Sequence, residues 1–412
     1  MSHNLPRSPL APALQPHLPP LAGVRIATAN SGTRYRGRPD LLLLTVPKGT
    51  SVAGLLTRST MPGAPVEWCR RHLGTGETRG VVVNAGNANV FTGAAGRQGT
   101  AAMAAAGAFA LGCAPEEMLV ASTGVIGQPL DHATIAGVLR GMGPGLTEDA
   151  WDQAAAAICT TDTFPKLATA SAILSGTTVT INGIAKGSGM IAPDMATLLA
   201  FIVTDAALPA PVLAAALRQA NARSFNCLTV DGDTSTSDTL LLFATGTAGN
   251  RRPATLGDPA LKDFRRALAA VAASLAEQVA RDGEGASKLV RIRVSGAQSS
   301  RAARVIALAI ANSPLVKTAI AGGDANWGRI VMAVGKSGEK ADRDRLEIRL
   351  GGQPVTFAGA LDPAYDEAQA TLHLQTREID IAVDVGVGRG RAQVWTCDLT
   401  HGYIDINADY RS

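Results

Sequence analysis

The sequence predicts a mixed α/β protein in which sheets and helices are layered. Short apolar runs of strand length alternate with longer segments in which apolar residues recur every three or four positions. This alternation is the pattern of strands and amphipathic helices packed on one another. Hydrophobic residues make up 46% of the 412 residues and charged residues only 17%, so the chain can bury a large core.

The first half of the chain alternates predicted strands and predicted helices. The strands are DLLLLTV near residue 40, GVVVNAG near residue 80 and MLVAST near residue 118. The helices are expected over 99–112, 132–141 and 148–158. Farther on, Asn182–Gly183 is the favoured pair of a two-residue hairpin turn. A turn is therefore predicted there, which would return Lys186 beside the preceding strand.

The second half is expected to contain a strand from Thr197 and helices over 209–222, 261–279 and 299–312. The helix over 261–279 is the clearest, because its apolar residues recur at three- and four-residue spacing. These residues are Leu261, Phe264, Leu268, Val271, Leu275 and Val279. The remaining apolar segments are interpreted as strands, namely TLLLFAT, GRIVMAV, DRLEIRL, EIDIAVDV and RAQVWTC.

Charge and cysteine usage exclude several classes of function. The formal net charge of +4 is spread thinly, without a run of five like charges, so neither a nucleic-acid groove nor a basic membrane patch is expected. The five cysteines are far apart and lack CxxC spacing, which indicates a reducing compartment. Residues 1–20 hold six prolines and no continuous apolar stretch. A flexible tail is expected there rather than a secretion signal, and the protein is predicted to be cytoplasmic.

The acidic stretch DGDTSTSD at 231–238 allows a metal-binding interpretation. It lacks the twelve-residue pattern of a calcium loop, and no His or Cys supplies a further ligand. No metal site is therefore predicted.

The stretch KGSGMIAPDMATLLAF at 186–201 contains a threonine at a boundary. The segment before it contains glycines and a proline, and the segment after it is apolar. An internal threonine has no base beside it, but cleavage before Thr197 would place an α-amine with a pKa of about 7.7–8.0 next to its hydroxyl. The same hydroxyl can make the cut by attacking the carbonyl of Ala196, which converts the amide into an ester that water hydrolyses. The simpler interpretation is that Thr197 only begins a strand, where β-branched residues are common.

This threonine is accompanied by a series of ordered blocks along the chain. The other blocks are ASTGVIG (121–127), CTTDTFPK (159–166), SFNCLTVDGDTSTSDT (224–239), DGEGASK (282–288), ANSPLVKTA (311–319), GGDANWGR (322–329) and INADYRS (406–412). In these blocks the chain resembles the ornithine acetyltransferase (glutamate N-acetyltransferase) family of arginine biosynthesis. The resemblance implies a layered fold of the N-terminal-nucleophile type, and it favours Thr197 as the nucleophile. The region 21–75 follows the family only loosely.

Members of that family cleave themselves before this threonine, here between Ala196 and Thr197. The resemblance therefore implies an α chain of residues 21–196 and a β chain of residues 197–412, assembled as α2β2. The family's oxyanion-hole pair matches Thr123 and Gly124, a side-chain hydroxyl and a backbone N–H. The positions that match substrate-binding residues are Thr160, Lys186, Thr197, Glu284, Asn407 and Ser412.

The reaction that the resemblance implies is acyl transfer in two halves. Thr197 would take the acetyl group of N2-acetylornithine, and glutamate would then remove it as N-acetylglutamate, with ping-pong kinetics. No metal or organic cofactor is expected, and acetyl-CoA is a possible second donor. Two alternatives remain open. One is an N-terminal-nucleophile aminopeptidase or amidase, which releases acyl groups to water. The other is a binding protein that stays a single, unprocessed chain.

Overall fold

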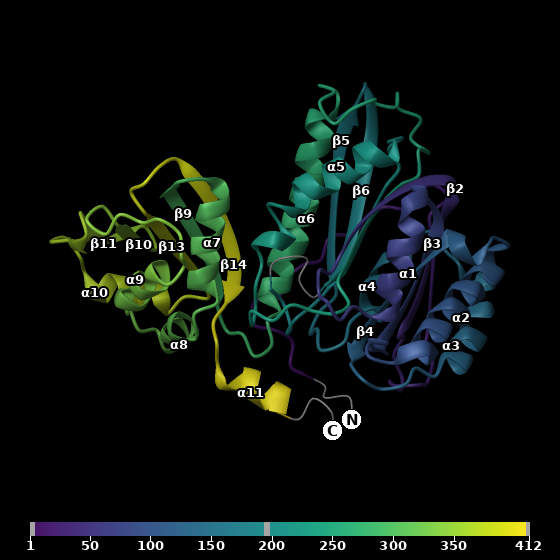
Figure 1. Ribbon diagram of the computed structural model, residues 1–412, viewed down its shortest axis with the longest axis horizontal. Helices are drawn as coiled ribbons and strands as arrows, with labels where there is room; N and C mark the ends of the chain where they lie inside the picture. Colours follow the sequence, from purple (N-terminus) through teal and green to yellow (C-terminus); the bar gives the residue numbers. More distant parts are fainter. Residues whose placement is uncertain (1–4, 193–197, 409–412) are drawn as a thin grey trace.

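The computed structural model describes residues 5–192 and 198–408. Residues 1–4, 193–197 and 409–412 lie outside the described part, and with them Ala196, Thr197 and Ser412. The described residues form two mixed sheets flanked by helices (Figure 1), which confirms the predicted α/β class.

The larger sheet runs in the order β4-β3-β2-β8-β7-β6-β5, with β1 paired to β2. Its strands are β1 (Arg25–Ala29), β2 (Leu41–Leu56), β3 (Glu77–Asn87), β4 (Met118–Val125), β5 (Lys166–Leu174), β6 (Thr177–Lys186), β7 (Leu199–Thr204) and β8 (Thr239–Ala244). β3 and β4 are parallel, as are β7 and β8. The start of β7 lies between the end of β6 and the start of β8, because Leu199 pairs with both Lys186 and Thr239.

Helices cover both faces of this sheet, because its strands carry apolar residues on both sides. On β2, Leu41 and Leu43 pack in a cluster with α2 and α3, while Leu42 and Leu44 pack in a second cluster with Trp151 of α4. α5 and α6 pack over the half that contains β5 to β8. The helices of this part are α1 (Ala64–His72), α2 (Gly93–Leu111), α3 (His132–Arg140), α4 (Trp151–Ala157), α5 (Ala210–Asn221) and α6 (Leu261–Arg281).

The smaller sheet has the order β12-β11-β10-β13-β9-β14. Its strands are β9 (Leu289–Ala297), β10 (Glu347–Leu350), β11 (Gln353–Phe357), β12 (Ala360–Leu361), β13 (Glu378–Asp384) and β14 (Gly390–Cys397). On β9, Ile292 and Val294 are buried in the core, while Arg291 and Arg293 on the alternate face pair with carboxylates of β13. Its helices are α7 (Ser300–Ala311), α8 (Pro314–Gly322), α9 (Trp327–Gly335) and α10 (Glu367–Leu374).

The last described helix, α11 (His401–Ala408), follows β14 and projects away from the smaller sheet (Figure 1). None of the residues of α11 is buried. Within residues 5–192 and 198–408, no single helix is long and apolar enough to cross a membrane. α7 and α8 reach that length and apolarity only as a pair, with a bend of 59° between them.

The predicted turn at Asn182–Gly183 is wrong, because both residues lie inside β6. The hairpin between β5 and β6 turns instead at Ser175 and Gly176, whose φ angles are 53° and 84°. Gly183 is needed for a different reason. A Cβ atom there would lie 2.9 Å from Leu275 Cδ1, so glycine allows α6 to pack close to the strand.

The predicted strand GRIVMAV is also wrong, because this segment forms α9. Ile330, Ala333 and Val334 are its buried residues, and their spacing of three and four positions is that of one helix face. Burial of this face decides the structure against the strand preference of its β-branched residues.

Residues 5–20 contain no helix or strand, as their prolines predict. They are nevertheless packed against the body of the protein. Leu10 and Leu18 are 4% and 1% exposed, and each belongs to a hydrophobic cluster. The described part of the expected flexible tail is therefore held in place by these two apolar side chains.

Candidate active site

A cavity of about 320 Å³ opens where the ends of β4 and β6 approach the loop before β8, the loop after α6, and α11. Six of the residues matched to functional positions of the family line it, namely Thr123, Gly124, Thr160, Lys186, Glu284 and Asn407. Apart from the adjacent pair Thr123 and Gly124, these residues are distant in the sequence, so the fold brings them together. Ala196, Thr197 and Ser412 lie outside the described residues, and their positions remain predictions.

Lys186, the last residue of β6, places its ammonium group against two hydroxyls of the cavity. Its side chain is buried, and Nζ lies 3.1 Å from Thr123 Oγ1 and 2.8 Å from Thr160 Oγ1. An ammonium group only donates hydrogen bonds. Both hydroxyls therefore accept from Lys186, and each keeps its own proton for another acceptor. Thr123 can in this way donate to an oxyanion in the cavity.

Gly124 occupies a backbone position that requires glycine. Its φ angle is 126°, and a Cβ atom there would lie 2.3 Å from the carbonyl carbon of Gly86 on β3. β4 can approach Gly86 this closely only because residue 124 lacks a side chain. The close approach fixes the backbone that carries the second predicted oxyanion donor, the N–H of Gly124.

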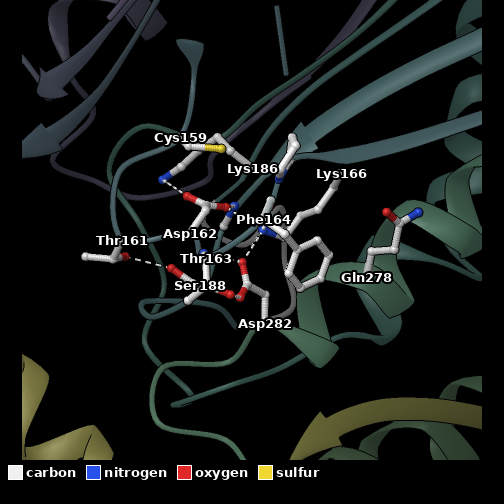
Figure 2. Close-up of polar contacts among 12 residues, drawn as sticks. Cys159, Thr161, Asp162, Thr163, Phe164, Lys166, Lys186, Ser188, Gln278 and Asp282 are labelled. Atoms are coloured by element: carbon white, nitrogen blue, oxygen red, sulfur yellow. Dashed lines mark hydrogen bonds and ion pairs between the residues drawn. The ribbon is translucent and has the colours of Figure 1, made fainter. Parts of the chain in front are cut away.

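A group of buried charged residues lies next to Lys186 (Figure 2). This ionic cluster consists of Asp162, Lys166 and Asp282. Lys166 Nζ lies 2.7 Å from Asp162 Oδ1 and 2.6 Å from Asp282 Oδ2, and the side chains of Lys166 and Asp162 are fully buried. Burial raises the pKa of Asp162, but the charges of Lys166 and Lys186 outweigh it and hold this pKa below its ordinary value. Burial lowers the pKa of Lys166, but the two carboxylates raise it above its ordinary value.

The ionic cluster ties together the loops that carry the predicted substrate residues. Asp162 accepts hydrogen bonds from the N–H of Thr160 at 3.0 Å and from the N–H of Gly187, next to Lys186, at 2.6 Å. Asp282 stands two residues before Glu284 on the loop after α6. Sequence reasoning missed the cluster, although all three members lie within the blocks that carry the resemblance.

Another wall of the cavity is acidic and is formed by the loop after α6 together with α11. Glu284 is 8% exposed, and its Oε2 accepts a hydrogen bond from Asn407 Nδ2 at 2.8 Å. Tyr403, also on α11, donates from its hydroxyl to Asp231 Oδ2 at 3.2 Å. Asp231 belongs to the acidic stretch 231–238, and its other carboxylate oxygen accepts from the backbone N–H of Ile191 at 2.9 Å. α11 is thus held over the cavity by polar contacts.

The family of the chain follows from comparison with known proteins. A model of the ArgJ family matches residues 25–412. The chain belongs to the ArgJ family. The match covers nearly the whole region 21–75. The sequence blocks of this region resemble those of the family only loosely.

Individual ArgJ proteins are similar over the full length of the chain. The arginine biosynthesis bifunctional protein ArgJ of Brucella suis biovar 1 (strain 1330) is 56% identical over 408 residues, which are 98% of this chain and 99% of that protein. Among solved structures, the arginine biosynthesis bifunctional protein ArgJ from Bacillus halodurans is 40% identical, with a TM-score of 0.49 over 50% of this chain and 97% of that one. An ornithine acetyltransferase from Mycobacterium tuberculosis, complexed with ornithine, is 32% identical, with a TM-score of 0.38 over 47% of this chain and 96% of that one.

Proposed function

We propose that this ArgJ-family chain is a self-processing acetyltransferase of arginine biosynthesis. It transfers an acetyl group from N2-acetylornithine to glutamate through an acetyl ester of Thr197. Cleavage between Ala196 and Thr197 produces an α chain that ends at residue 196 and a β chain of residues 197–412. Membership of the ArgJ family supports this reaction, because the relatives are named as bifunctional proteins of arginine biosynthesis.

The observation that carries the proposal is the contact of Lys186 with Thr123 and Thr160 in a cavity that Glu284 and Asn407 border on another side. An amino acid carries a carboxylate and an ammonium group. The ammonium group of Lys186 suits the carboxylate, and the carboxylate of Glu284 suits the ammonium. A volume of about 320 Å³ is of the size that holds one small substrate.

In the first half of the reaction, the hydroxyl of Thr197 attacks the acetyl carbonyl and its proton passes to the α-amine of the same residue. The hydroxyl of Thr123 and the N–H of Gly124 stabilise the oxyanion that forms. The C–N bond then breaks, and ornithine leaves with that proton on its amine. In the second half, the amine of glutamate attacks the acetyl ester, the C–O bond breaks, and Thr197 regains its hydroxyl.

Further features follow from the same proposal. The substrates are small amino acids, and the processed chains assemble as α2β2 in the cytoplasm. Acetyl-CoA serves as a second donor, in keeping with the bifunctional names of the relatives. Asn407 and the terminal Ser412 complete the substrate site from the C-terminal segment.

The reaction is tested with N2-acetylornithine that carries a labelled acetyl group, with and without glutamate. We expect ornithine release to depend on glutamate, labelled N-acetylglutamate to form in equal amount, and double-reciprocal plots to be parallel. Labelled acetate that forms at the same rate without glutamate would instead identify an amidase. An unprocessed chain that releases nothing would identify a binding protein. Lys186→Met removes the ammonium group that is proposed to bind the substrate carboxylate. We expect this variant to have an increased KM.

A further inference from the structure

Asp231 lines the cavity, but the proposed reaction assigns it no role. It lies in the loop before β8, and two backbone N–H groups bind its Oδ1, that of Ile191 at 2.9 Å and that of Asp233 at 3.0 Å. Its Oδ2 accepts a hydrogen bond from the hydroxyl of Tyr403 at 3.2 Å. These three contacts fix the carboxylate in the wall of the cavity.

Two residues of α11 bring a second carboxylate to the same wall. Tyr403 binds Asp231, and Asn407 binds Glu284 Oε2 at 2.8 Å. Residues four positions apart are neighbours on one face of a helix, and Asn407 Nδ2 also donates to the carbonyl of Tyr403 at 3.0 Å. Asp231 and Glu284 therefore contact adjacent positions of α11, and both line the cavity there.

The two carboxylates have no cationic partner within residues 5–192 and 198–408, where neither forms an ion pair with a Lys, Arg or His side chain. Burial and the charge of Asp233 raise the pKa of Asp231 above its ordinary value, although its backbone hydrogen bonds lower it. Burial also raises the pKa of the Tyr403 hydroxyl, as do the charges of Asp231 and Glu284. A cation bound at this wall would stabilise both ionised carboxylates.

The other residues of the cavity leave this wall to the side chain of the donor substrate. Lys186 suits the α-carboxylate of N2-acetylornithine, and Thr123 and Gly124 are the predicted donors to its acetyl oxygen. One charged group of the donor is then left without a partner, namely the ammonium at the end of its side chain. Asp231 and Glu284 are carboxylates that line the same cavity and can bind this ammonium.

We propose that Asp231 is a specificity-determining residue for the donor: together with Glu284 it binds the side-chain ammonium of N2-acetylornithine. This inference rests on the proposed function and adds the residue that selects a diamino acid. An ammonium group has three N–H donors, so it needs more acceptors than Glu284 offers beside its bond to Asn407. The side chain of glutamate ends in a carboxylate, which Asp231 repels, so Asp231 favours the donor and not the acceptor.

Asp231→Asn tests the proposal with two donors, N2-acetylornithine and N2-acetylnorvaline, which lacks only the side-chain amine. The amide oxygen of the variant can still accept from the two backbone N–H groups, and its NH2 group can donate to the hydroxyl oxygen of Tyr403. The variant therefore removes the charge and keeps the contacts that hold the loop. The ratio of kcat/KM between the two donors measures what the ammonium contributes to the first half of the reaction.

We expect the wild type to prefer N2-acetylornithine by at least about 10²-fold, because its buried carboxylates are left without a cation when the analogue binds. In Asp231→Asn, kcat/KM for N2-acetylornithine should fall by about 10- to 100-fold, as for loss of a charge-assisted hydrogen bond. The value for N2-acetylnorvaline should change by less than about 3-fold, and kcat/KM for glutamate should not fall. A merely structural role predicts an equal fall for all three substrates.

The matched control is Asp205→Asn. Asp205 directly follows β7 and is not among the residues that line the cavity. Its Oδ1 accepts a backbone N–H from Thr180 at 2.7 Å, and burial raises its pKa as well. This variant should keep the wild-type preference between the two donors and change only the melting temperature.

Three results would overturn the inference: a donor preference of Asp231→Asn within about twofold of wild type, an equal loss of kcat/KM for glutamate, or an equal loss of preference in Asp205→Asn. If Asp231→Asn does not fold, Asp231→Ser replaces it, because a hydroxyl oxygen can also accept from the backbone N–H groups. The same loss of preference is then expected. A wild type that transfers acetyl equally well from both donors refutes only the inference, whereas a wild type that transfers no acetyl group refutes the proposed function itself.

Discussion

Lys166 and Asp162 form an ion pair of 2.7 Å that is fully shielded from solvent. The same ammonium group lies 2.6 Å from Asp282, and Asp162 in turn lies 3.9 Å from Lys186. The charge of Asp162 is therefore shared between a lysine outside the cavity and a lysine that lines it. Asp162 lies closer to Lys166 than to Lys186, and Lys186 makes its hydrogen bonds to Thr123 and Thr160.

The first prediction concerns Lys166→Met, which leaves Asp162 with Lys186 as its remaining cation among the described contacts. Removal of one partner of a buried pair should lower the free energy of unfolding by about 3–5 kcal/mol. Asp162 should also draw Lys186 away from the cavity and raise KM for both amino-acid substrates by about 10-fold, which corresponds to about 1.4 kcal/mol. Steady-state kinetics and calorimetry measure the two effects separately.

The control for Lys166→Met is the double variant Lys166→Met/Asp162→Asn, which also removes the carboxylate that would draw Lys186. It should recover most of the loss in KM, because no buried charge next to Lys186 is then left without its partner. If Lys166→Met lowers the melting temperature but leaves KM unchanged, the ionic cluster stabilises the fold without directing Lys186.

The second prediction concerns acid stability. The folded-state pKa of Asp162 is lowered by Lys166 and Lys186, so its contribution is fully present above the unfolded value of about 3.9. That contribution is lost as the pH falls below the unfolded value toward the folded one. Melting temperatures between about pH 5 and pH 2, at intervals of about half a unit, should fall more steeply for wild type than for Asp162→Asn. Asp149→Asn, an exposed aspartate, should follow the wild-type slope.

The third prediction concerns the oxyanion hole. Thr123→Val keeps the shape of the side chain but removes the hydroxyl that accepts from Lys186. We expect kcat to fall by about 10²–10³-fold, as for loss of one oxyanion donor, with a smaller change in KM. Thr123→Ser should retain most of the activity. Equal rates for the valine and serine variants would show that this hydroxyl does not act on the transition state.

The fourth prediction concerns the contact between α11 and Glu284. Asn407→Asp replaces the amide donor by an oxygen that faces Glu284 Oε2, from which Asn407 Nδ2 is 2.8 Å away. Repulsion between the two carboxylates should displace α11 and raise KM by about 10-fold, or about 1.4 kcal/mol. The melting temperature should change little, because α11 has no buried residues.

The exchanged pair Asn407→Asp/Glu284→Gln restores one donor and one acceptor between the same positions. Because Glu284→Gln also removes the carboxylate proposed to bind the substrate ammonium, the pair is compared with Glu284→Gln alone, and an equal KM is expected if the contact itself positions α11. Asp405→Asn on the exposed part of α11 is the control and should leave KM unchanged. A wild-type KM in Asn407→Asp would show that α11 takes no part in substrate binding.

The sequence blocks predicted which distant residues lie together better than they predicted the local structure around these residues. Thr123, Lys186 and Glu284 lie in sequence blocks that identify the family, and the fold places all three in one cavity. The ion pair of Lys166 and Asp282 joins positions 116 residues apart, and no local pattern states which distant charges will meet. The sequence blocks of the family show which residue types stand at which positions. Which buried charges pair with one another depends on tertiary packing.

Local preferences failed where tertiary packing opposed them. Asn182–Gly183 has the sequence of a hairpin turn, but Gly183 is used to let Leu275 of α6 approach β6. In α9, the spacing of Ile330 and Ala333 along one buried face outweighs the strand preference of the neighbouring valines. Residues 193–197, which include Thr197, lie outside the described part of the chain, so the nucleophile remains a prediction from the sequence and the family.

The measurement that tests the central claim most directly is the denatured mass of the freshly purified protein beside its Thr197→Ala variant. We predict that the wild type gives two chains, the second beginning at Thr197, whose masses sum to the 42.2 kDa of the full chain plus one water. The variant should remain a single chain of full mass, because it lacks the hydroxyl that attacks Ala196. A wild-type protein that stays whole while it transfers acetyl to glutamate, or a Thr197→Ala variant that is still cleaved, would contradict the account.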